Sequence, residues 1–286
     1  MTSEVVQITD VVCVHGEGPV WSPTWDSLRV LDMLEGTIVS IDGDGTASRH
    51  KVGDVVALTR PRAPGGWVCV TDRGLLAASE DRLDADLTLV SELWSDPAVR
   101  PNEGGCAPDG GLLIGSTSWD GIDGLGELLR VDPDGSVRRI LTGLGVSNGL
   151  GWTADGRFAY YIDSGTRVIE RFRWSPETSL TDRTTWAALT GPGAGDGLAV
   201  DSEGGVWVAM YGGGALHHYT SEGVLDEVVD LPVSQPTSLT FAGPDLNRLV
   251  VTTSSYALER PESGAGAVFE VRNHNTRGLP VQPFTG

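Results

Sequence analysis

One unit that recurs along the chain limits the possible folds more than any other feature of the sequence. Its clearest copy is residues 146–165 (VSNGLGWTADGRFAYYIDSG), in which a polar entry leads through an apolar stretch and a tight turn into a second apolar stretch. Five other stretches align with it on the turn. The turn positions lie roughly 40 to 48 residues apart, which is the period of a four-stranded propeller blade, at Asp26, Gly66, Gly110, Gly156, Gly204 and Leu246.

Six such units fill the chain and together predict an all-β fold, a six-bladed β-propeller that spans residues 1–286 as a single domain. A β-rich unit of this length cannot bury both faces of its own sheet, so neighbouring units must stack around an axis. The 39 glycines and 16 prolines fit the many turns of such a fold. We expect residues 7–14 to form a strand that joins the last blade, beside residues 266–271, and closes the ring.

Positions at one shared offset before each turn define a candidate site. About eight or nine residues upstream, where the innermost strand of each blade should begin, stand six residues that are all polar except the second: Glu17, Leu58, Asn102, Asn148, Asp196 and Ser238. Equivalent positions of a propeller converge at one mouth of its channel. We therefore expect these residues to surround the binding site, with Leu58 in its wall.

Each of these residues also has a purely structural explanation when it is taken alone. Glu17 lies between two glycines and fits a solvated loop. Asn148-Gly149 and Asp196-Gly197 fit hairpin turns, because both dipeptides favour positive φ. Unrelated turns have no reason to place oxygen donors at the same blade position, so the shared offset favours the functional explanation.

The segment before the third unit adds groups suited to a ligand. Arg100 carries a planar guanidinium, which can bind hydroxyls or a carboxylate of a ligand, while Asn102 adds an amide and Glu103 a carboxylate. The structural alternative is that this segment is only a turn. Residues 116–126 (STSWDGIDGLG) connect two strands of a blade and are a candidate lid over the mouth, with Trp119, Asp120 and Asp123 as its candidate residues; a surface turn is the favoured alternative for each. The nine tryptophans are otherwise expected to pack between blades rather than to form a sugar-stacking platform.

Composition excludes several classes of partner. The formal net charge of −19 disfavours nucleic acid and anionic membranes and favours a hard cation, although a role in solubility explains the charge equally well. Three unpatterned cysteines predict neither a disulfide framework nor a thiolate metal site. The N-terminus lacks the features of a signal peptide, and no apolar run reaches membrane length. These features predict a cytoplasmic protein and leave its oligomeric state open.

Three of the ring residues suit a metal ion. Glu17, Asn148 and Asp196 offer two carboxylates and one amide carbonyl, and hard divalent cations, Ca²⁺ first and Mg²⁺ or Mn²⁺ next, prefer such oxygen ligands. Three protein ligands leave coordination positions open for water and substrate. An open metal site can polarise a carbonyl or phosphoryl oxygen and lower the pKa of bound water.

Several longer segments form a specific set: GEGPVW at residues 16–21, RPNEGG at 100–105, VSNGLGW at 146–152, YYIDS at 160–164, GDGLAVDSEGGVWVAMYGGG at 195–214 and LPVSQPTSLTFAG at 231–243. In these segments the chain resembles the SMP-30/gluconolactonase/LRE-like family, which includes regucalcin. The resemblance implies a six-bladed propeller with a divalent metal, usually Ca²⁺ or Zn²⁺, that hydrolyses lactones, often of sugars. It matches Glu17, Asn148 and Asp196 to the metal ligands, Asp196 also to the proposed general base, and Arg100 and Asn102 to positions that contact substrate.

Two residues depart from the family pattern. Family members commonly have Asn-Asp-Gly followed shortly by Asp-Pro, whereas Glu103 and Ala107 replace the two aspartates here. The longer side chain of Glu103 is expected to reach farther into the pocket and to contact the substrate. The connection at residues 116–126 is also short beside that of the sugar-lactonase members, which predicts a more open lid. The altered motif and the short connection weaken the case for a sugar substrate more than the case for a metal.

The sequence therefore predicts a metal-dependent lactonase, a carboxylic ester hydrolase of the gluconolactonase type. In this hypothesis the cation acts as Lewis acid and Asp196 as general base on a small-molecule lactone. Two alternatives remain open: a phosphotriesterase that uses the same ion on organophosphates, and a non-enzymatic calcium- or ligand-binding propeller. The sequence identifies neither the particular lactone nor the metal.

Overall fold

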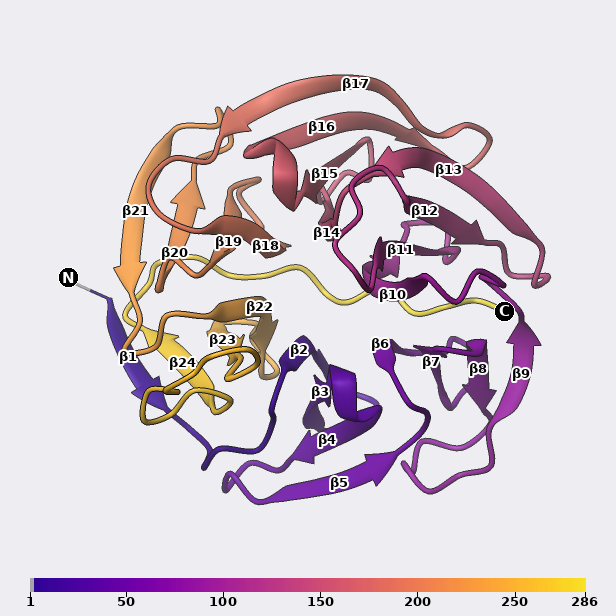
Figure 1. Cartoon of the computed structure of the whole chain (residues 1–286), viewed down its shortest axis with the longest axis horizontal. Coiled ribbons are helices and arrows are strands. Elements are labelled where there is room, and N and C mark those ends of the chain that lie inside the picture. Colours follow the sequence, from indigo (N-terminus) through magenta and orange to yellow (C-terminus); the bar gives the residue numbers. More distant parts are fainter. Residues whose placement is uncertain (1–2) are drawn as a thin grey trace.

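The computed structural model describes residues 3–286 and contains six four-stranded antiparallel sheets arranged around a central channel (Figure 1). The predicted six-bladed β-propeller is therefore confirmed. Five blades follow the chain order from the channel outward, and the sixth combines both ends of the chain. Two short 3₁₀ helices, η1 (Met33–Glu35) and η2 (Ser164–Thr166), follow the second strands of blades 1 and 4.

The strands fall into four concentric sets. The innermost strands are β2 (Gly16–Ser22), β6 (Val56–Pro61), β10 (Val99–Cys106), β14 (Ser147–Trp152), β18 (Ala194–Val200) and β22 (Pro236–Ala242). The second strands are β3 (Ser27–Asp32), β7 (Trp67–Thr71), β11 (Leu112–Ser118), β15 (Phe158–Asp163), β19 (Val206–Tyr211) and β23 (Arg248–Thr253). The third strands are β4 (Thr37–Ile41), β8 (Gly74–Ala78), β12 (Gly126–Val131), β16 (Val168–Ser175), β20 (Ala215–Tyr219) and β24 (Val268–Arg272). The outermost strands are β5 (Ala47–Lys51), β9 (Thr88–Ser91), β13 (Val137–Leu144), β17 (Ser179–Ala188), β21 (Leu225–Asp230) and β1 (Glu4–Gln7).

The turn between the first two strands of each blade matches the repeat seen in the sequence. All six aligned turn positions have positive φ, between 48° at Asp26 and 88° at Gly204. Glycine adopts this left-handed conformation without a steric penalty, and it occupies four of the six positions. Asp26 and Leu246 adopt the same conformation with a side chain, so the turn geometry is retained even where glycine is absent.

The N-terminal segment closes the ring, as expected, but through an earlier strand than the sequence suggested. β1 pairs with β24, with Val5 opposite Val271, so only Gln7 of the predicted strand 7–14 belongs to the ladder. Where the chain leaves the sheet, the side-chain hydroxyl of Thr9 accepts the N–H of Val268. Beyond it, the amides of residues 12 and 13 both donate to the carbonyl of Gly266, which wraps the segment around a turn.

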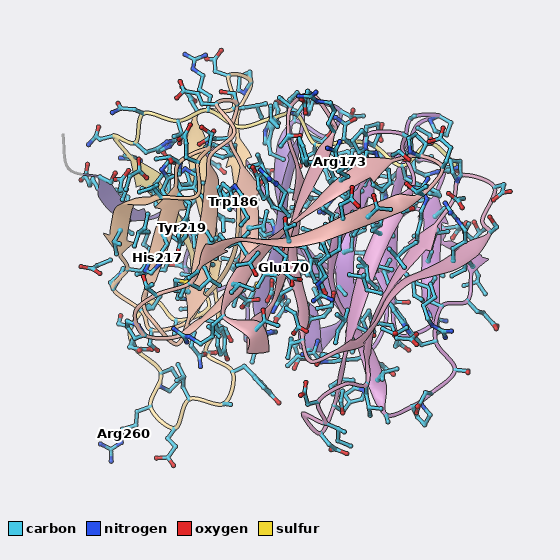
Figure 2. The ribbon with its side chains drawn as sticks, turned by 90° about the horizontal axis from the view of Figure 1, so that it is seen from above. Glu170, Arg173, Trp186, His217, Tyr219 and Arg260 are labelled. Carbon is cyan, nitrogen blue, oxygen red and sulfur yellow. The ribbon has the colours of Figure 1, made fainter. Side chains whose placement is uncertain are left out.

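Apolar side chains fill the spaces between neighbouring blades. Tryptophans contribute to this packing as expected: Trp186 of β17 in blade 4 lies 6.4 Å, between ring centroids, from Tyr219 of β20 in blade 5, and Figure 2 shows both from the side. Trp67 and Trp207 are fully buried. In the same view the loop that carries Arg260 projects beyond the sheets. None of the helices within residues 3–286 combines the length and apolar character needed to cross a bilayer.

The last ten residues, 277–286, form a segment that we call the strap (Figure 1, yellow). It crosses the end of the channel at which the turns between the first and second strands of the blades lie. Gly278 donates to the carbonyl of Leu246 in blade 6, and Phe284 donates to the carbonyl of Pro61 in blade 2. Phe284 is completely buried in the cluster formed mainly by blades 2 and 3. Thr285 also donates to the carbonyl of Gly110 in blade 3, so the strap links blade 6 with blades 2 and 3 across the end of the channel away from the candidate site.

Candidate active site

Irregular strand pairing changes the direction of the side chains that form the candidate ring. In every innermost strand the register with the second strand shifts at or directly beside the predicted position, between residues 17 and 20, 56 and 58, 101 and 104, 147 and 150, 195 and 198, and 236 and 239. A bulge inserts extra backbone into one strand and turns a side chain away from the regular alternation. The six bulges explain why polar residues can leave the sheet faces and lie at the channel.

One ring residue is placed differently from the prediction. Leu58, expected in the pocket wall, is 1% exposed and packs in the core cluster between blades 2 and 3. The irregularity in β6 leaves one residue, Ala57, without a partner in β7, whereas that in β10 leaves two residues, Asn102 and Glu103, opposite the single residue Gly115 of β11. A fixed offset therefore misses by one position in blade 2, and Ala57 rather than Leu58 lines the channel cavity.

Three carboxylates gather at the ring. Glu17 and Asp196 are 4% and 7% exposed, and burial raises the pKa of each well above its usual range. The negative charges of Glu17 and Glu103 raise the pKa of Asp196 further, while Arg100 opposes them. Burial also raises the pKa of Glu103 to about 7, against the opposing effects of Ser238 and Arg60. The three acids share one electrostatic environment that favours a proton or a cation.

Two amides connect blades 3 and 4 beside these acids. Nδ2 of Asn102 donates to Oδ1 of Asn148 at 2.9 Å and also to the carbonyl of Ser147 at 2.9 Å. Arg100 donates from Nη1 to Oδ1 of Asn102 at 2.7 Å. Both amides are almost completely buried. Arg100, Asn102 and Asn148 therefore form one connected polar group at the mouth.

His15, directly before the innermost strand β2, lies close to Glu17. Nε2 of His15 is 3.8 Å from Oε1 of Glu17, and its Nδ1 lies 2.8 Å from Oγ of Ser254. Burial lowers the pKa of His15 to about 4, and the positive charge of Arg100 acts in the same direction. A neutral imidazole thus lies beside the carboxyl group of Glu17 at neutral pH.

The expected lid contributes a shorter loop than its sequence range. Residues 116–118 belong to β11, and residue 126 begins β12, so residues 119–125 form the loop. Trp119 is 51% exposed, and the guanidinium carbon of Arg100 lies 5.6 Å from the centre of its ring. The loop therefore reaches the mouth at Arg100.

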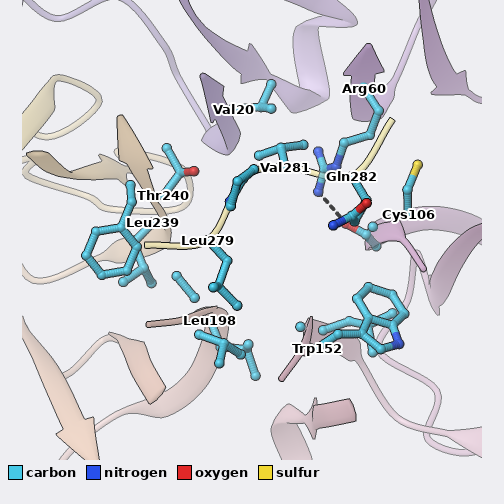
Figure 3. Close-up of a pocket in the computed structure, with 18 of the residues that line it drawn as sticks. Val20, Arg60, Cys106, Trp152, Leu198, Leu239, Thr240, Leu279, Val281 and Gln282 are labelled. Carbon is cyan, nitrogen blue, oxygen red and sulfur yellow. Dashed lines mark hydrogen bonds between the residues drawn. The ribbon is translucent and has the colours of Figure 1, made fainter. Parts of the chain in front are cut away.

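A cavity of about 340 Å³ lies in the channel between the ring and the strap (Figure 3). Glu103 and Ser238 line it on the ring side, and Leu279 and Val281 line it on the strap side. Arg60 also faces it and donates from Nη2 to the carbonyl of Gly104 at 2.7 Å. Glu17, Asn148 and Asp196 do not line this cavity. We call it the lower cavity, because it lies farther along the channel toward the strap than the candidate ligands do.

The residues present fit a hard divalent cation. Within residues 3–286 no three His, Cys, Asp or Glu side chains converge as a ligand set. The candidate set, however, takes its third ligand from the amide oxygen of Asn148 on β14, in addition to the carboxylates of Glu17 on β2 and Asp196 on β18. In the described part of the chain the buried Oε2 of Glu103 also lacks a hydrogen-bond partner. Buried carboxylates with raised proton affinity and an amide oxygen are suitable donors for Ca²⁺ or Mg²⁺.

Several polar groups around the ring were not singled out from the sequence. Ser164 contacts Asn148, and Tyr211 lies close enough for Asp196 and Glu17 to raise its pKa, after the larger effect of burial. Arg60, which the sequence argument also did not identify, lowers the pKa of Glu103 together with the predicted ring residue Ser238. Ser164 and Tyr211 lie inside the longer segments described above, but only the folded chain brings their side chains to the ring.

The fold and this ring define a class: six-bladed propellers whose channel mouth carries acidic and amide side chains on strand bulges. Residues 15–255 match the SMP-30/Gluconolactonase/LRE-like region, and the chain belongs to this family. It is 32% identical over 279 residues to the pentonolactonase XacC of Haloferax volcanii, covering 93% of this chain and 94% of that protein. It is 31% identical to regucalcin of Danio rerio, covering 95% of both chains.

A solved structure agrees with these relatives. The crystal structure of regucalcin from Agrobacterium tumefaciens, described as a calcium-binding protein, superposes with a TM-score of 0.91 at 25% identity and covers 98% of this chain and 97% of that one. The resemblance inferred from the sequence segments is thereby confirmed. Members of the family carry the names of lactonases, and one relative is described as binding calcium.

Proposed function

We propose that this protein is a divalent-metal-dependent lactonase that hydrolyses a small-molecule lactone to the hydroxy acid. The observation that carries the proposal is the convergence of buried carboxylates and amides from different blades at one channel mouth. Similarity along nearly the whole chain to a pentonolactonase supports the reaction class. The buried, unpaired thiols of Cys13, Cys69 and Cys106 fit the reducing cytoplasm that we propose as its location.

In this proposal Glu17, Asn148 and Asp196 hold the ion. Ca²⁺ fits the all-oxygen set best, and Zn²⁺, Mg²⁺ and Mn²⁺ are the alternatives. When bound, the ion supplies Lewis-acid polarisation of the lactone carbonyl and charge stabilisation for the oxyanion that develops. The buried position of the two carboxylates keeps bulk water from competing with this interaction.

The side chains of this protein would perform the proton transfers and orient the substrate. Asp196 accepts a proton from the attacking water while the water oxygen bonds to the carbonyl carbon. The ring C–O bond then breaks, and Asp196 returns the proton to the leaving alkoxide, which gives a hydroxy acid. Arg100 and Asn102, already joined by a hydrogen bond, orient the lactone, and Glu103 accepts hydrogen bonds from its hydroxyl groups.

Metal removal and replacement test the proposal. Protein stripped with a chelator and then titrated with Ca²⁺, Zn²⁺, Mg²⁺ or Mn²⁺ is assayed in a pH-stat against pentonolactones, hexonolactones and simple aliphatic lactones. We expect no turnover above the uncatalysed rate without metal and recovery with at least one cation. Full turnover by the stripped protein would overturn the metal dependence, and no turnover of any lactone under all conditions would overturn the reaction.

A calcium-binding propeller without catalysis is the second candidate, because the Agrobacterium tumefaciens relative is described as calcium-binding. It predicts that Ca²⁺ binds to the stripped protein but that no lactone is hydrolysed. A phosphotriester in the same assay series tests the remaining hydrolase alternative, since the same oxygen ligands would hold an ion that polarises a phosphoryl oxygen.

A further inference from the structure

A directional chain of hydrogen bonds runs through three neighbouring blades at the ring. It begins at Arg100 and passes through the side chains of Asn102 in blade 3 and Asn148 in blade 4. Nδ2 of Asn148 then donates to Oγ of Ser164 at 2.7 Å. Ser164 in turn donates to the carbonyl of Gly195 in blade 5, also at 2.7 Å.

The two ends of the chain fix the direction of every bond. A guanidinium can only donate, so Arg100 requires the oxygen of the Asn102 amide to face it. A backbone carbonyl can only accept, so the single hydroxyl proton of Ser164 is committed to Gly195. Ser164 can then only accept from Asn148, which requires the NH₂ group of that amide to face the serine.

This requirement decides which atom Asn148 presents to the ring. With its NH₂ group held by Ser164, Asn148 directs Oδ1 to the opposite side, where it accepts one bond from Asn102. An amide oxygen has two lone pairs, so one remains for a cation. The reversed amide would instead present two N–H donors, which cannot bind a metal ion.

We infer that Ser164 is a positioning residue that orients Asn148 for metal binding, an inference that rests on the proposed metal site. Ser164 lies at the start of η2, directly after β15, and its own amide donates to the carbonyl of Val146 at 3.1 Å. The backbone that carries the Ser164 hydroxyl is therefore anchored within blade 4. Because Gly195 immediately precedes Asp196, the same hydroxyl also ties Asn148 to the backbone that carries a second proposed ligand.

Loss of this hydroxyl should lower the affinity for the metal ion while the protein still folds. Residues that orient a metal ligand typically contribute about 10- to 100-fold to affinity. We expect Ser164→Ala to weaken Ca²⁺ binding by at least about 10-fold when the stripped protein is titrated in a calorimeter. Ser164→Thr keeps the hydroxyl and should bind within about threefold of the wild type, whereas Ser164→Val, which has the shape of threonine, should resemble the alanine variant.

Ser91 provides a matched control. Its Oγ also donates to a backbone carbonyl of the next blade, that of Gly135, at 2.6 Å, but it lies in the outermost strand β9. Ser91→Ala should leave Ca²⁺ affinity unchanged even if it lowers the melting temperature. Titrations of Mn²⁺, followed by electron paramagnetic resonance, provide a second readout that does not depend on catalysis.

The outcomes separate this inference from the proposed function. If wild-type protein binds Ca²⁺ and hydrolyses a lactone while Ser164→Val binds the ion as tightly as Ser164→Thr, the positioning role is wrong and the proposed function stands. If wild-type protein binds none of the cations, both fail. If Ser164→Ala does not fold, the comparison of the isosteric threonine and valine variants still decides.

Discussion

Oγ of Ser238 donates a hydrogen bond at 3.2 Å to Oε1 of Glu103, and this bond joins blade 6 to the opposite blade 3 across the channel. The side chain of Glu103, which is longer than the aspartate common in the family, thus reaches across the channel to blade 6 instead of remaining near its own strand. It lies between the candidate ligands on one side and the lower cavity on the other. Glu103 therefore forms part of the floor of the mouth.

This position predicts a pH dependence of stability in the metal-free protein. Burial raises the pKa of Glu103 from 4.5 to about 7, so the folded chain binds this proton more tightly than the unfolded chain. The contribution of Glu103 to the free energy of unfolding should consequently fall as the pH rises from about 4.5 to about 7 and should change little above that range. Urea unfolding of chelator-stripped protein across this range measures the slope.

Glu103→Gln is the matched variant for this slope, because it keeps the size of the side chain and removes the titrating group. We expect it to be less dependent on pH than the wild type between pH 5 and about 7. Saturating Ca²⁺ should also stabilise the wild type, by RT ln(1 + [L]/Kd). Identical slopes for wild type and Glu103→Gln would show that Glu103 does not titrate in this range.

The closure of the ring predicts a large effect of a short deletion. Removal of residues 1–7 eliminates β1 and leaves the edge of β24 unpaired, although the deleted strand itself is only partly buried. We expect a lower melting temperature and concentration-dependent aggregation, because an open sheet edge pairs with other chains. Thermal unfolding and light scattering measure both effects. Val11→Ser, in the exposed segment after β1, should show neither change.

Repetition made much of this architecture predictable from the sequence. The six turns share one backbone conformation, so aligning them gave the blade number and the positions of Glu17, Asn102, Asn148 and Asp196 on the innermost strands. The offset failed at Leu58 because the form of the bulge differs between blades: one residue of β6 has no partner, whereas two residues of β10 lie opposite one residue of β11.

Contacts between distant segments could not be inferred in the same way. The hydrogen bond from Ser238 to Glu103 depends on two blades facing each other across the channel. The contact of Ser164 with Gly195 depends on the spacing of adjacent blades. The strap has no counterpart in the repeat, so its path across the channel follows only from the folded ring.

Phe284 predicts how much the strap contributes to stability. Its side chain is fully buried among residues of blades 2 and 3, including Leu112 and Ile114. Replacement of a buried phenylalanine by alanine removes apolar contact and leaves a cavity, so Phe284→Ala should lower the free energy of unfolding by about 3 to 5 kcal/mol.

Urea unfolding at constant metal concentration measures this change. Val137→Ala on the outer strand β13 is the control, since that side chain is 38% exposed and its truncation should change stability by less than about 0.5 kcal/mol. A similarly small effect at Phe284 would mean that the strap is not an integral part of the fold.

Substitution of the two buried carboxylates separates metal binding from proton transfer. Glu17 and Asp196 are proposed as ligands, but only Asp196 is proposed to accept the proton of the attacking water. Glu17→Gln should therefore weaken metal affinity and recover most of its turnover in excess metal. Asp196→Asn keeps an oxygen ligand but loses the base, so its kcat should stay about 10²- to 10⁴-fold below that of the wild type even when calorimetry shows the site to be saturated. Wild-type turnover by metal-saturated Asp196→Asn would remove this residue from the chemical step and leave it a role in binding alone.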